Sequence, residues 1–515
     1  MKRSRLADLG FLVLAAGILV AVTWDAFVFR LITHLPGSDY WEHTAVLRAL
    51  IENPLHPRHP SIVTTAGSPR FGPHYLLVAL VAKLVRFGPI DAMALASVVN
   101  TVLFLLGIFL FFRRYFGDAR ASLYGLVVLF GTWLADAPHF SNVYKLSVFF
   151  SNAGYPSTAA LAVTLLLLTL AVRLLRGETA PPALLAVLAL GVAYLYVTHP
   201  LTAMMAFTAL LALAATDPGA SRRRRISVAA AVPAGLVLAC LWPYYPALGM
   251  VAGGTTDRVG RALAQRHVPL HEFYTPARLR QIIGFAVLGV PCLAYFVVVR
   301  RHLFVVWGTL AMLAVFVGSA LVPVPLGHRF VLLAVFFLQV ALVFLLLALT
   351  PRGDAWPGHP RVRLAAALGT GVFLAYLSAA NVVEARERFA EVRGGVSPTV
   401  RIGRRVGQIA RTTGVVLGDP LPCWSLPTFG PRIVALHHSN PLVPDTDERT
   451  QQVRRFFAPS TPNREREAIL SRYSVTHVLF RSRQGGSAER FIEKRAEAFD
   501  LPAGLTLYAL QPAPH

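Results

Sequence analysis

Two carboxylic acids and a histidine stand together directly after the first long apolar segment of the chain. Asp39, Glu42 and His43 belong to the run Gly-Ser-Asp-Tyr-Trp-Glu-His that begins at Gly37. If a helix starts at Tyr40, these three side chains are spaced by three and four residues and share one helix face. A carboxylate held in this way can take a proton from a hydroxyl group as that hydroxyl attacks an electrophile. The spacing therefore nominates Asp39 as a general base, with Glu42 beside it.

Two other interpretations of Asp39 stay open at the level of the sequence. The dipeptide Pro36-Gly37 predicts a turn, after which Ser38 or Asp39 can cap the helix that follows. Alternatively, Asp39 and Glu42 could together hold a divalent cation, because carboxylates suit magnesium and manganese. The sequence indicates no other cofactor.

Cationic side chains near the outer ends of the apolar segments could bind the phosphate group of a lipid substrate. Arginine suits this task because its guanidinium group presents a fork of donors. His328 and Arg329 follow a stretch broken by proline and glycine, and such backbone is tolerated at membrane depth mainly beside a cavity. The predicted phosphate-binding residues are Lys145, Arg258, Arg261, His328 and Arg329.

A substrate pocket is predicted to add aromatic and imidazole side chains to the two acids. Tyr40 and His43 lie on the same predicted helix as Glu42. His56 and His59 alternate with prolines, which forbid a helix, so a rigid loop that shapes a pocket is favoured over a helical metal site. The predicted pocket residues are Tyr40, His43, His56, His59 and His199.

The composition places these residues in a membrane protein. Of the 515 residues, 55% are hydrophobic and only 15% are charged, whereas soluble proteins have about 25% charged residues. The formal net charge is +23. Such a charge can indicate nucleic-acid binding, but arginine also accumulates on the cytoplasmic turns of membrane proteins. We therefore expect no nucleic-acid partner, and the three cysteines show no metal-binding spacing.

The apolar segments predict about eleven membrane-spanning helices. Every second turn between them is rich in arginine, which places the N-terminus in the cytoplasm and the C-terminus on the opposite side. A shorter apolar stretch, 75–87, is predicted to lie as a helix in the outer interface. The predicted spans are 9–31, 91–112, 121–138, 156–175, 182–198, 200–216, 226–248, 281–299, 303–323, 328–349 and 363–383.

The composition changes after residue 384, which predicts a transmembrane domain at 1–384 and a second domain at 385–515. Short β-branched runs at 415–419, 432–436, 476–480 and 505–510 indicate strands. Polar stretches at 447–457, 462–473 and 487–499 indicate helices between them. Strands that alternate with helices are typical of an α/β domain, here predicted to be extracytoplasmic.

This organisation resembles the GT-C superfamily of integral membrane glycosyltransferases. Gly37-Ser38-Asp39-Tyr40 occupies the place of that family's essential acidic residue, in the first extracytoplasmic loop after the first span. His438-Ser439-Asn440-Pro441 and the run Tyr473–Leu479 look like the C-terminal tails of bacterial members. Many members carry adjacent acids or Asp-x-Asp, where this chain has Asp39 and Glu42. The resemblance implies a sugar donor carried on polyprenyl phosphate.

Together, these features predict a multi-pass glycosyltransferase of the bacterial inner membrane. It would move a sugar from a polyprenyl-phosphate donor to an extracytoplasmic hydroxyl group of a glycan, lipid or protein, in contact with membrane lipids. The absence of a nucleotide-binding signature such as a P-loop fits a lipid-linked donor. The alternatives are a transporter or flippase, or a ligase or polymerase, of lipid-linked glycans. The lack of an internal repeat weighs against a transporter.

Overall fold

A computed structural model of the chain describes residues 2–177, 181–247, 273–322, 324, 326–350, 360–391, 396–438, 440, 442–481 and 486–511. The chain divides into two compact units. We call Met1–Trp24 with Ala96–Arg393 the helical unit, and Asp25–Leu95 with Gly394–His515 the composite unit. The second name reflects its two separate stretches of chain.

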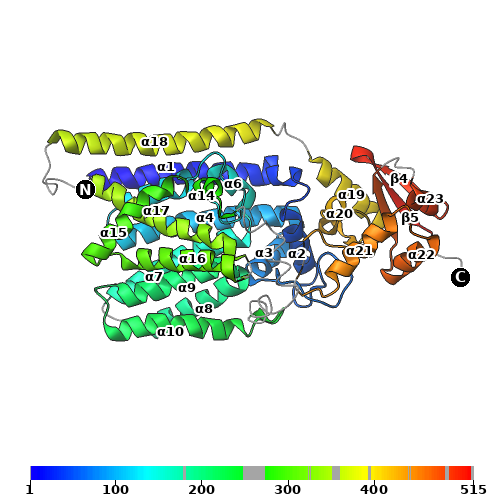
Figure 1. Cartoon of the computed structure of the whole chain (residues 1–515), viewed down its shortest axis with the longest axis horizontal. Coiled ribbons are helices and arrows are strands. Elements are labelled where there is room, and N and C mark those ends of the chain that lie inside the picture. The colour runs from blue at the N-terminus through cyan, green and yellow to red at the C-terminus, as the bar shows by residue number, and fades with distance from the viewer. Residues whose placement is uncertain are drawn as a thin grey trace. The chain divides into compact units, whose positions relative to one another are not determined.

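The helical unit consists of apolar helices that run side by side (Figure 1). Pairs that pack against each other include α8 with α10, α16 with α17 and α5 with α18. Arginines gather at helix ends, as in the last turns of α4 and α7 and the first turn of α10. Its helices are α1 (Lys2–Trp24), α4 (Pro89–Phe116), α5 (Arg120–Gly131), α6 (Leu146–Asn152), α7 (Pro156–Arg176), α8 (Pro182–Thr198), α9 (Pro200–Thr216), α10 (Arg222–Ala239), α14 (Pro276–Ile283), α15 (Val290–Val299), α16 (Leu303–Leu321), α17 (Phe330–Leu349) and α18 (Pro360–Glu391).

Each of the eleven predicted spans contains helix, although α5 and α10 end several residues before spans 121–138 and 226–248 do, and the polytopic helical fold is confirmed. Within the described residues, seven helices are long and apolar enough to cross a membrane: Arg5–Phe29, Pro89–Phe116, Pro156–Arg176, Pro276–Val299, Leu303–Leu321, Gly327–Leu349 and Ala365–Glu387. Three further predicted spans are shorter apolar helices, α5, α8 and α9. The remaining predicted span, 226–248, contains α10, which begins with four arginines that lower its hydropathy.

The composite unit begins with two helices that flank a long loop. The first, α2 (Tyr40–Glu52), follows the turn at Gly37, and the second, α3 (Pro73–Leu84), overlaps the stretch 75–87 that is predicted to lie in the interface. Tyr75 and Ala82 of α3 are buried, whereas Leu77 and Leu84 on its other side are exposed. The helix therefore presents an apolar face outward, and its place in the membrane interface stays a prediction.

The second stretch of the composite unit forms the small α/β sheet that the sequence predicts. Its elements are α19 (Pro398–Ala410), β1 (Val415–Leu417), α20 (Pro420–Cys423), β2 (Arg432–Ile433), α21 (Thr446–Phe457), α22 (Asn463–Arg472), β3 (His477–Arg481), α23 (Ser487–Glu493), β4 (Ala496–Leu501) and β5 (Leu505–Leu510). The strand order is β2-β1-β3-β5-β4. Strands β1, β2 and β3 are parallel, whereas β5 is antiparallel to both β3 and β4.

The interpretation of 487–499 as one helix is wrong at its end. Helix α23 stops at Glu493, and β4 begins at Ala496 and pairs with β5 along its whole length. Ala496 lies opposite Leu510, and Leu501 lies opposite Leu505. Alanine and glutamate in this segment favour helix locally, but the antiparallel partner decides the conformation because it satisfies the backbone groups.

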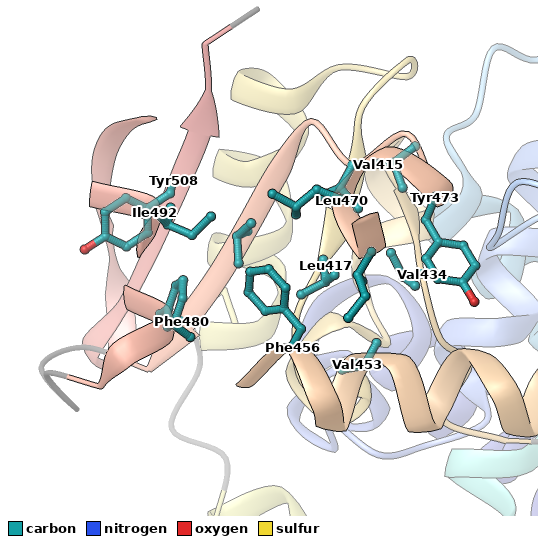
Figure 2. Packing of buried hydrophobic residues seen from close by; sticks show 14 of the residues in the cluster. Val415, Leu417, Val434, Val453, Phe456, Leu470, Tyr473, Phe480, Ile492 and Tyr508 are labelled. Atoms are coloured by element: carbon teal, nitrogen blue, oxygen red, sulfur yellow. The ribbon is translucent and has the colours of Figure 1, made fainter. Parts of the chain in front are cut away.

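A hydrophobic core lies between the sheet and its helices (Figure 2). Val478 of β3 and Phe456 of α21 are fully buried in it, and Ile492 of α23 packs into the same cluster. Removing a large apolar side chain from water contributes about 1.5–3 kcal/mol. This core holds the sheet rigid, so the loops at its edge can present side chains in fixed positions.

Candidate active site

Asp39 lies at the N-cap position of α2, but its side chain does not cap that helix. The neighbouring Ser38 does so instead, because its Oγ accepts a hydrogen bond from the backbone N–H of Tyr40 at 3.2 Å. The Asp39 side chain is 48% exposed. Its carboxylate is therefore available to a substrate instead of being used by the helix end.

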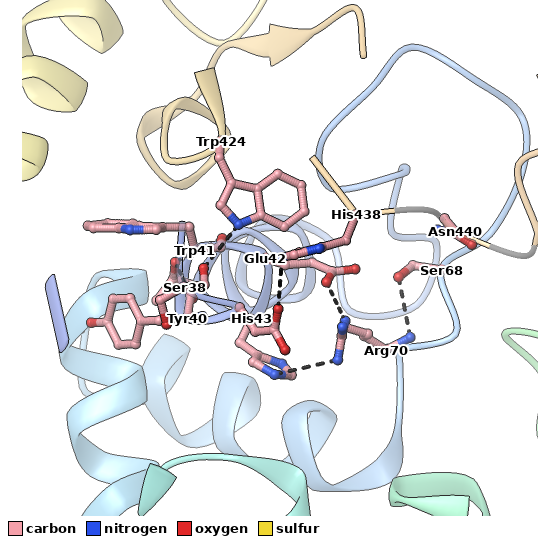
Figure 3. A network of polar contacts seen from close by, with 12 residues as sticks. Ser38, Tyr40, Trp41, Glu42, His43, Ser68, Arg70, Trp424, His438 and Asn440 are labelled. Carbon is pink, nitrogen blue, oxygen red and sulfur yellow. Dashed lines mark hydrogen bonds and ion pairs between the residues drawn. The ribbon is translucent and has the colours of Figure 1, made fainter. Parts of the chain in front are cut away.

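Glu42 and His43 on the next turn of α2 both face one arginine (Figure 3). Nε of Arg70 lies 2.7 Å from Oε2 of Glu42, and Nη1 of Arg70 lies 3.5 Å from Nε2 of His43. Ser68 accepts a hydrogen bond from the backbone N–H of Arg70. The Arg70 side chain is 31% exposed, and its guanidinium group joins the two α2 side chains.

His438, from the segment after β2, approaches Asp39 directly. Its Nε2 lies 3.1 Å from Oδ1 of Asp39. Nε1 of Trp424, from the segment after α20, donates a hydrogen bond to the carbonyl oxygen of Ser38 at 3.0 Å (Figure 3). Two side chains from the C-terminal stretch therefore contact the turn that carries the candidate base.

The charges of this cluster determine the ionisation of Asp39 and His438. Partial burial alone would raise the pKa of Asp39, but the contact with His438 and the positive charge of Arg70 outweigh it and hold that pKa below its usual range. Burial alone would lower the pKa of His438, but Asp39 and Glu42 outweigh it and raise that pKa above 6.5. At neutral pH Asp39 is therefore ionised, and its contact favours the protonated form of His438.

The loop that carries Arg70 is tied to the C-terminal stretch through His59. Nδ1 of His59 accepts hydrogen bonds from the backbone N–H groups of Ser61 and Ile62, and its Nε2 lies 3.2 Å from Nδ2 of Asn440. Burial, followed by the charge of Arg449, lowers the pKa of His59 to about 3. His59 is thus a neutral, buried part of the scaffold in this structure.

Arg449 of α21 links the two stretches of the composite unit. It is 7% exposed and pairs with Asp445 at 2.9 Å. It also donates to the carbonyl oxygens of Val434 and Val63 and lies over the ring of Tyr473. One buried guanidinium group therefore joins the Arg70 loop, the end of β2 and α21.

Replacing Arg449 by alanine is expected to destabilise the protein. The change removes two bonds to carbonyl oxygens and leaves Asp445 without its cation, which should lower the free energy of unfolding by roughly 2–4 kcal/mol. Thermal unfolding followed by tryptophan fluorescence measures this effect. Arg454→Ala on the exposed side of the same helix is the control. Equal midpoints for the two variants would contradict the structural role of Arg449.

The other predicted pocket residues of the composite unit lie in different settings. Tyr40 is 4% exposed and packs edge-on against Trp41. His56 is exposed in the loop after α2, where its backbone N–H bonds to the side chain of Asn53. The structure thus brings His43 beside Arg70, keeps Tyr40 in the core and leaves His56 at the surface.

The predicted residues of the helical unit are engaged within that unit. Lys145 is 3% exposed, pairs with Glu384 and donates to the carbonyl oxygen of Ala135. His199 caps α9, because its side chain accepts a hydrogen bond from the backbone N–H of Thr202. These two side chains therefore hold turns and helix ends in place.

His328 and Arg329 lie directly before α17, and each packs against the ring of a phenylalanine. The centres of the His328 and Phe273 rings are 4.4 Å apart, and the guanidinium group of Arg329 lies 5.1 Å from the centre of the Phe140 ring. The remaining predicted phosphate ligands, Arg258 and Arg261, lie outside the described residues. Binding of phosphate by any of these residues stays a prediction.

A divalent cation held by Asp39 and Glu42 stays a prediction. Glu42 faces Arg70, and Asp39 faces His438. Among the residues that the structure describes, no group of three or more His, Cys, Asp or Glu side chains could hold a metal ion. The two carboxylates contact the basic side chains of Arg70 and His438, and no step is routed through a metal.

Sequence reasoning missed Arg70 and His438 as candidate site residues. Arg70 lies three residues before the start of α3, in a proline-rich and glycine-rich loop whose path no local pattern reveals. His438 stood out only through the family resemblance of its tail segment. Neither position is close to Asp39 in the sequence, so only the folded chain brings them together.

Comparisons with known proteins identify the fold. No protein-family model matches the chain, and no curated protein matches it in sequence. Among solved structures, the chain is similar to ArnT from Cupriavidus metallidurans, with 14% identity, a TM-score of 0.58 and 98% of each chain covered. It is also similar to the oligosaccharyltransferase of Archaeoglobus fulgidus, with 12% identity, a TM-score of 0.55, and 98% of this chain and 74% of that chain covered.

A third similar structure is the arabinofuranosyltransferase AftD from Mycobacteria, with 13% identity and a TM-score of 0.55. There the match covers 99% of this chain but 40% of AftD. All three are membrane glycosyltransferases of the GT-C superfamily. The chain therefore has the GT-C fold and is a multi-pass membrane protein, as its apolar helices also indicate.

Proposed function

We propose that the chain is a glycosyltransferase that moves a sugar from a polyprenyl-phosphate donor to a hydroxyl acceptor. The observation that carries this proposal is the ionised, half-exposed carboxylate of Asp39 in one cluster with the guanidinium group of Arg70. A base and a phosphate-binding cation are the two groups that such a transfer needs. The fold supports the proposal, and the Archaeoglobus enzyme has been solved with a dolichol-phosphate.

In this mechanism, the acceptor hydroxyl attacks the anomeric carbon of the donor sugar. A bond forms between the acceptor oxygen and that carbon, and the bond from the carbon to the phosphate oxygen breaks. Asp39 takes the hydroxyl proton, and the phosphate leaves with the electron pair. General bases placed in this way typically contribute about 100- to 10,000-fold in rate.

Arg70 is proposed to stabilise the departing phosphate. The donor's phosphodiester carries one negative charge, and the released polyprenyl phosphate gains a second. A cation placed where charge develops lowers the barrier more than it strengthens ground-state binding. The Nε and Nη1 atoms of Arg70 face Glu42 and His43, and the side chain as a whole is partly exposed; we propose that its fork of donors also meets a phosphate.

The acceptor and the membrane orientation are part of the same proposal. We infer a glycan, lipid or protein acceptor on the side of the membrane opposite the cytoplasm, in the bacterial inner membrane. The alternation of arginine-rich turns supports a cytoplasmic N-terminus and an extracytoplasmic α/β domain. Lys145, His328, Arg329, Arg258 and Arg261 remain proposed as further contacts of the lipid phosphate.

The proposal is tested with the purified full-length chain in lipid vesicles. A panel of polyprenyl-phosphate donors with radiolabelled sugars is supplied together with an extract of cell-envelope acceptors. We expect time-dependent transfer of label from one donor to a water-soluble or lipid acceptor, with release of free polyprenyl phosphate. Movement of a donor across the vesicle membrane without cleavage would instead support the flippase alternative.

A further inference from the structure

We propose that His438, contributed by the α/β domain, is a positioning residue that holds the Asp39 carboxylate toward the acceptor. This inference rests on the proposed transferase activity and adds to it a role for the C-terminal stretch. The contact that carries it is the 3.1 Å approach of His438 Nε2 to Asp39 Oδ1. Without that contact, the half-exposed carboxylate could rotate about its side-chain bonds.

The topology of the sheet explains how the histidine reaches this place. Strands β1, β2 and β3 are parallel, so their carboxyl ends lie at one edge of the sheet. In open α/β sheets, ligand-binding groups gather outside this edge. His438 follows shortly after the end of β2 at Ile433, and a backbone hydrogen bond from Ile433 to Ser61 at 2.8 Å fixes that strand to the Arg70 loop.

Aromatic packing restrains the imidazole ring of His438. Trp424 meets it edge-on with the ring centres 5.2 Å apart, and the ring of His437 lies 4.5 Å away. Trp424 is 1% exposed, and its indole N–H is bonded to the carbonyl oxygen of Ser38. The same two side chains therefore hold both Ser38 and Asp39, which leaves the turn little freedom.

The charged groups around His438 come from three segments. Asp39 and Glu42 on α2 favour its cationic form, Arg70 on the loop before α3 opposes it, and burial opposes it as well. His43 adds to the positive charge near Asp39. On its own segment, the pKa of His437 is lowered, first by burial and then by the charge of His438.

This balance gives the ion pair a defined pH range. The pKa of His438 is raised above 6.5, so its contribution is fully present below 6.5 and is lost as the pH rises through the raised value. The pKa of Asp39 is lowered below 3.8, so its contribution is present above 3.8 and is lost only as the pH falls through the lowered value. Transfer should therefore decline on the alkaline side when His438 loses its proton.

The test compares His438→Gln with His437→Gln in the transfer assay. We expect His438→Gln to lower kcat by roughly 10- to 100-fold, the size that follows from removing one charged contact, with a smaller change in KM. The alkaline decline assigned to His438 should disappear in this variant. His437→Gln should keep the alkaline decline, because it removes a ring that packs against His438 but leaves the contact between His438 and Asp39 in place.

A second measurement does not depend on activity. The imidazole pKa of His438 is determined by NMR on histidine-labelled protein, in the parent and in Asp39→Asn. We expect a value above 6.5 in the parent and a lower one in the variant, because the anionic partner is lost. An unchanged pKa would overturn the pairing.

The outcomes separate this inference from the proposed function. If the parent protein transfers no sugar from any donor, the proposed function fails, and the NMR result still decides whether the ion pair exists. If the parent is active and His438→Gln keeps the parental rate and pH profile, the proposed function stands and the positioning role is overturned.

Discussion

Purified Asp39→Asn protein is expected to transfer sugar about 100- to 10,000-fold more slowly than the parent, the usual loss when a general base is removed. Asparagine keeps the size and shape of the side chain but cannot accept the hydroxyl proton. The Asp39 side chain makes no capping hydrogen bond, so the helix end should survive the change. Transfer from a polyprenyl-phosphate donor, measured at equal protein yield, checks this result.

Asp419→Asn is the matched control for that experiment. The Asp419 carboxylate accepts a hydrogen bond from the backbone N–H of Leu421 and caps α20. Asparagine caps a helix about as well as aspartate, so this variant should remain close to the parent in both activity and stability. Near-parental activity of Asp39→Asn as well would reject Asp39 as the base.

Arg70→Ala is expected to lower kcat by about 100- to 1,000-fold, the size seen when one preorganised donor to a developing negative charge is removed. It should also weaken binding of the product, polyprenyl phosphate, because that phosphate carries more charge than the donor. Both effects follow from the placement of Arg70 within 2.7 Å of Glu42 and beside the Asp39 cluster. Steady-state kinetics and binding of labelled polyprenyl phosphate measure them.

Two further variants make the Arg70 experiment decisive. Glu42 is 13% exposed, so alanine at position 70 leaves a largely buried carboxylate without its cation. Arg70→Lys keeps that charge but loses the fork of donors, and it should fold normally while remaining slow. Arg58→Ala, at an exposed arginine of the same loop, should behave like the parent. Parental affinity of Arg70→Lys and Arg70→Ala for polyprenyl phosphate would exclude Arg70 as a phosphate ligand.

The helical architecture could be predicted from the sequence because its signal is local. A long run of apolar residues between arginine-rich turns is enough to identify a membrane helix, since the bilayer requires an apolar surface and internally satisfied backbone. Strands β1, β3 and β5 were predictable for a similar reason, as short β-branched runs between polar helices. Helix α5 is shorter than expected, since it ends at Gly131 although the apolar run continues.

The segment from Ala496 to Leu501 shows a case in which residue types predict the wrong secondary structure. Its residue types favour helix, yet it forms β4, because pairing with β5 satisfies its backbone along the whole strand. Strand β5 follows after only Pro502–Gly504, so the two strands form a hairpin. The error therefore arose because pairing with β5 outweighs the helix preference of the residues in β4.

By itself, the sequence determined the membrane class, the α/β character of the C-terminal stretch, and Asp39 with Glu42 as the acids to examine. Only the tertiary structure decided which basic side chains meet them: Arg70 from a loop and His438 from beyond β2. The physical reason is that residue type and periodicity depend on near neighbours, whereas charge pairing depends on which distant segments the packed sheet and its loops bring within a few ångströms. The pKa of Asp39, and with it the chemistry proposed here, is set by those distant partners.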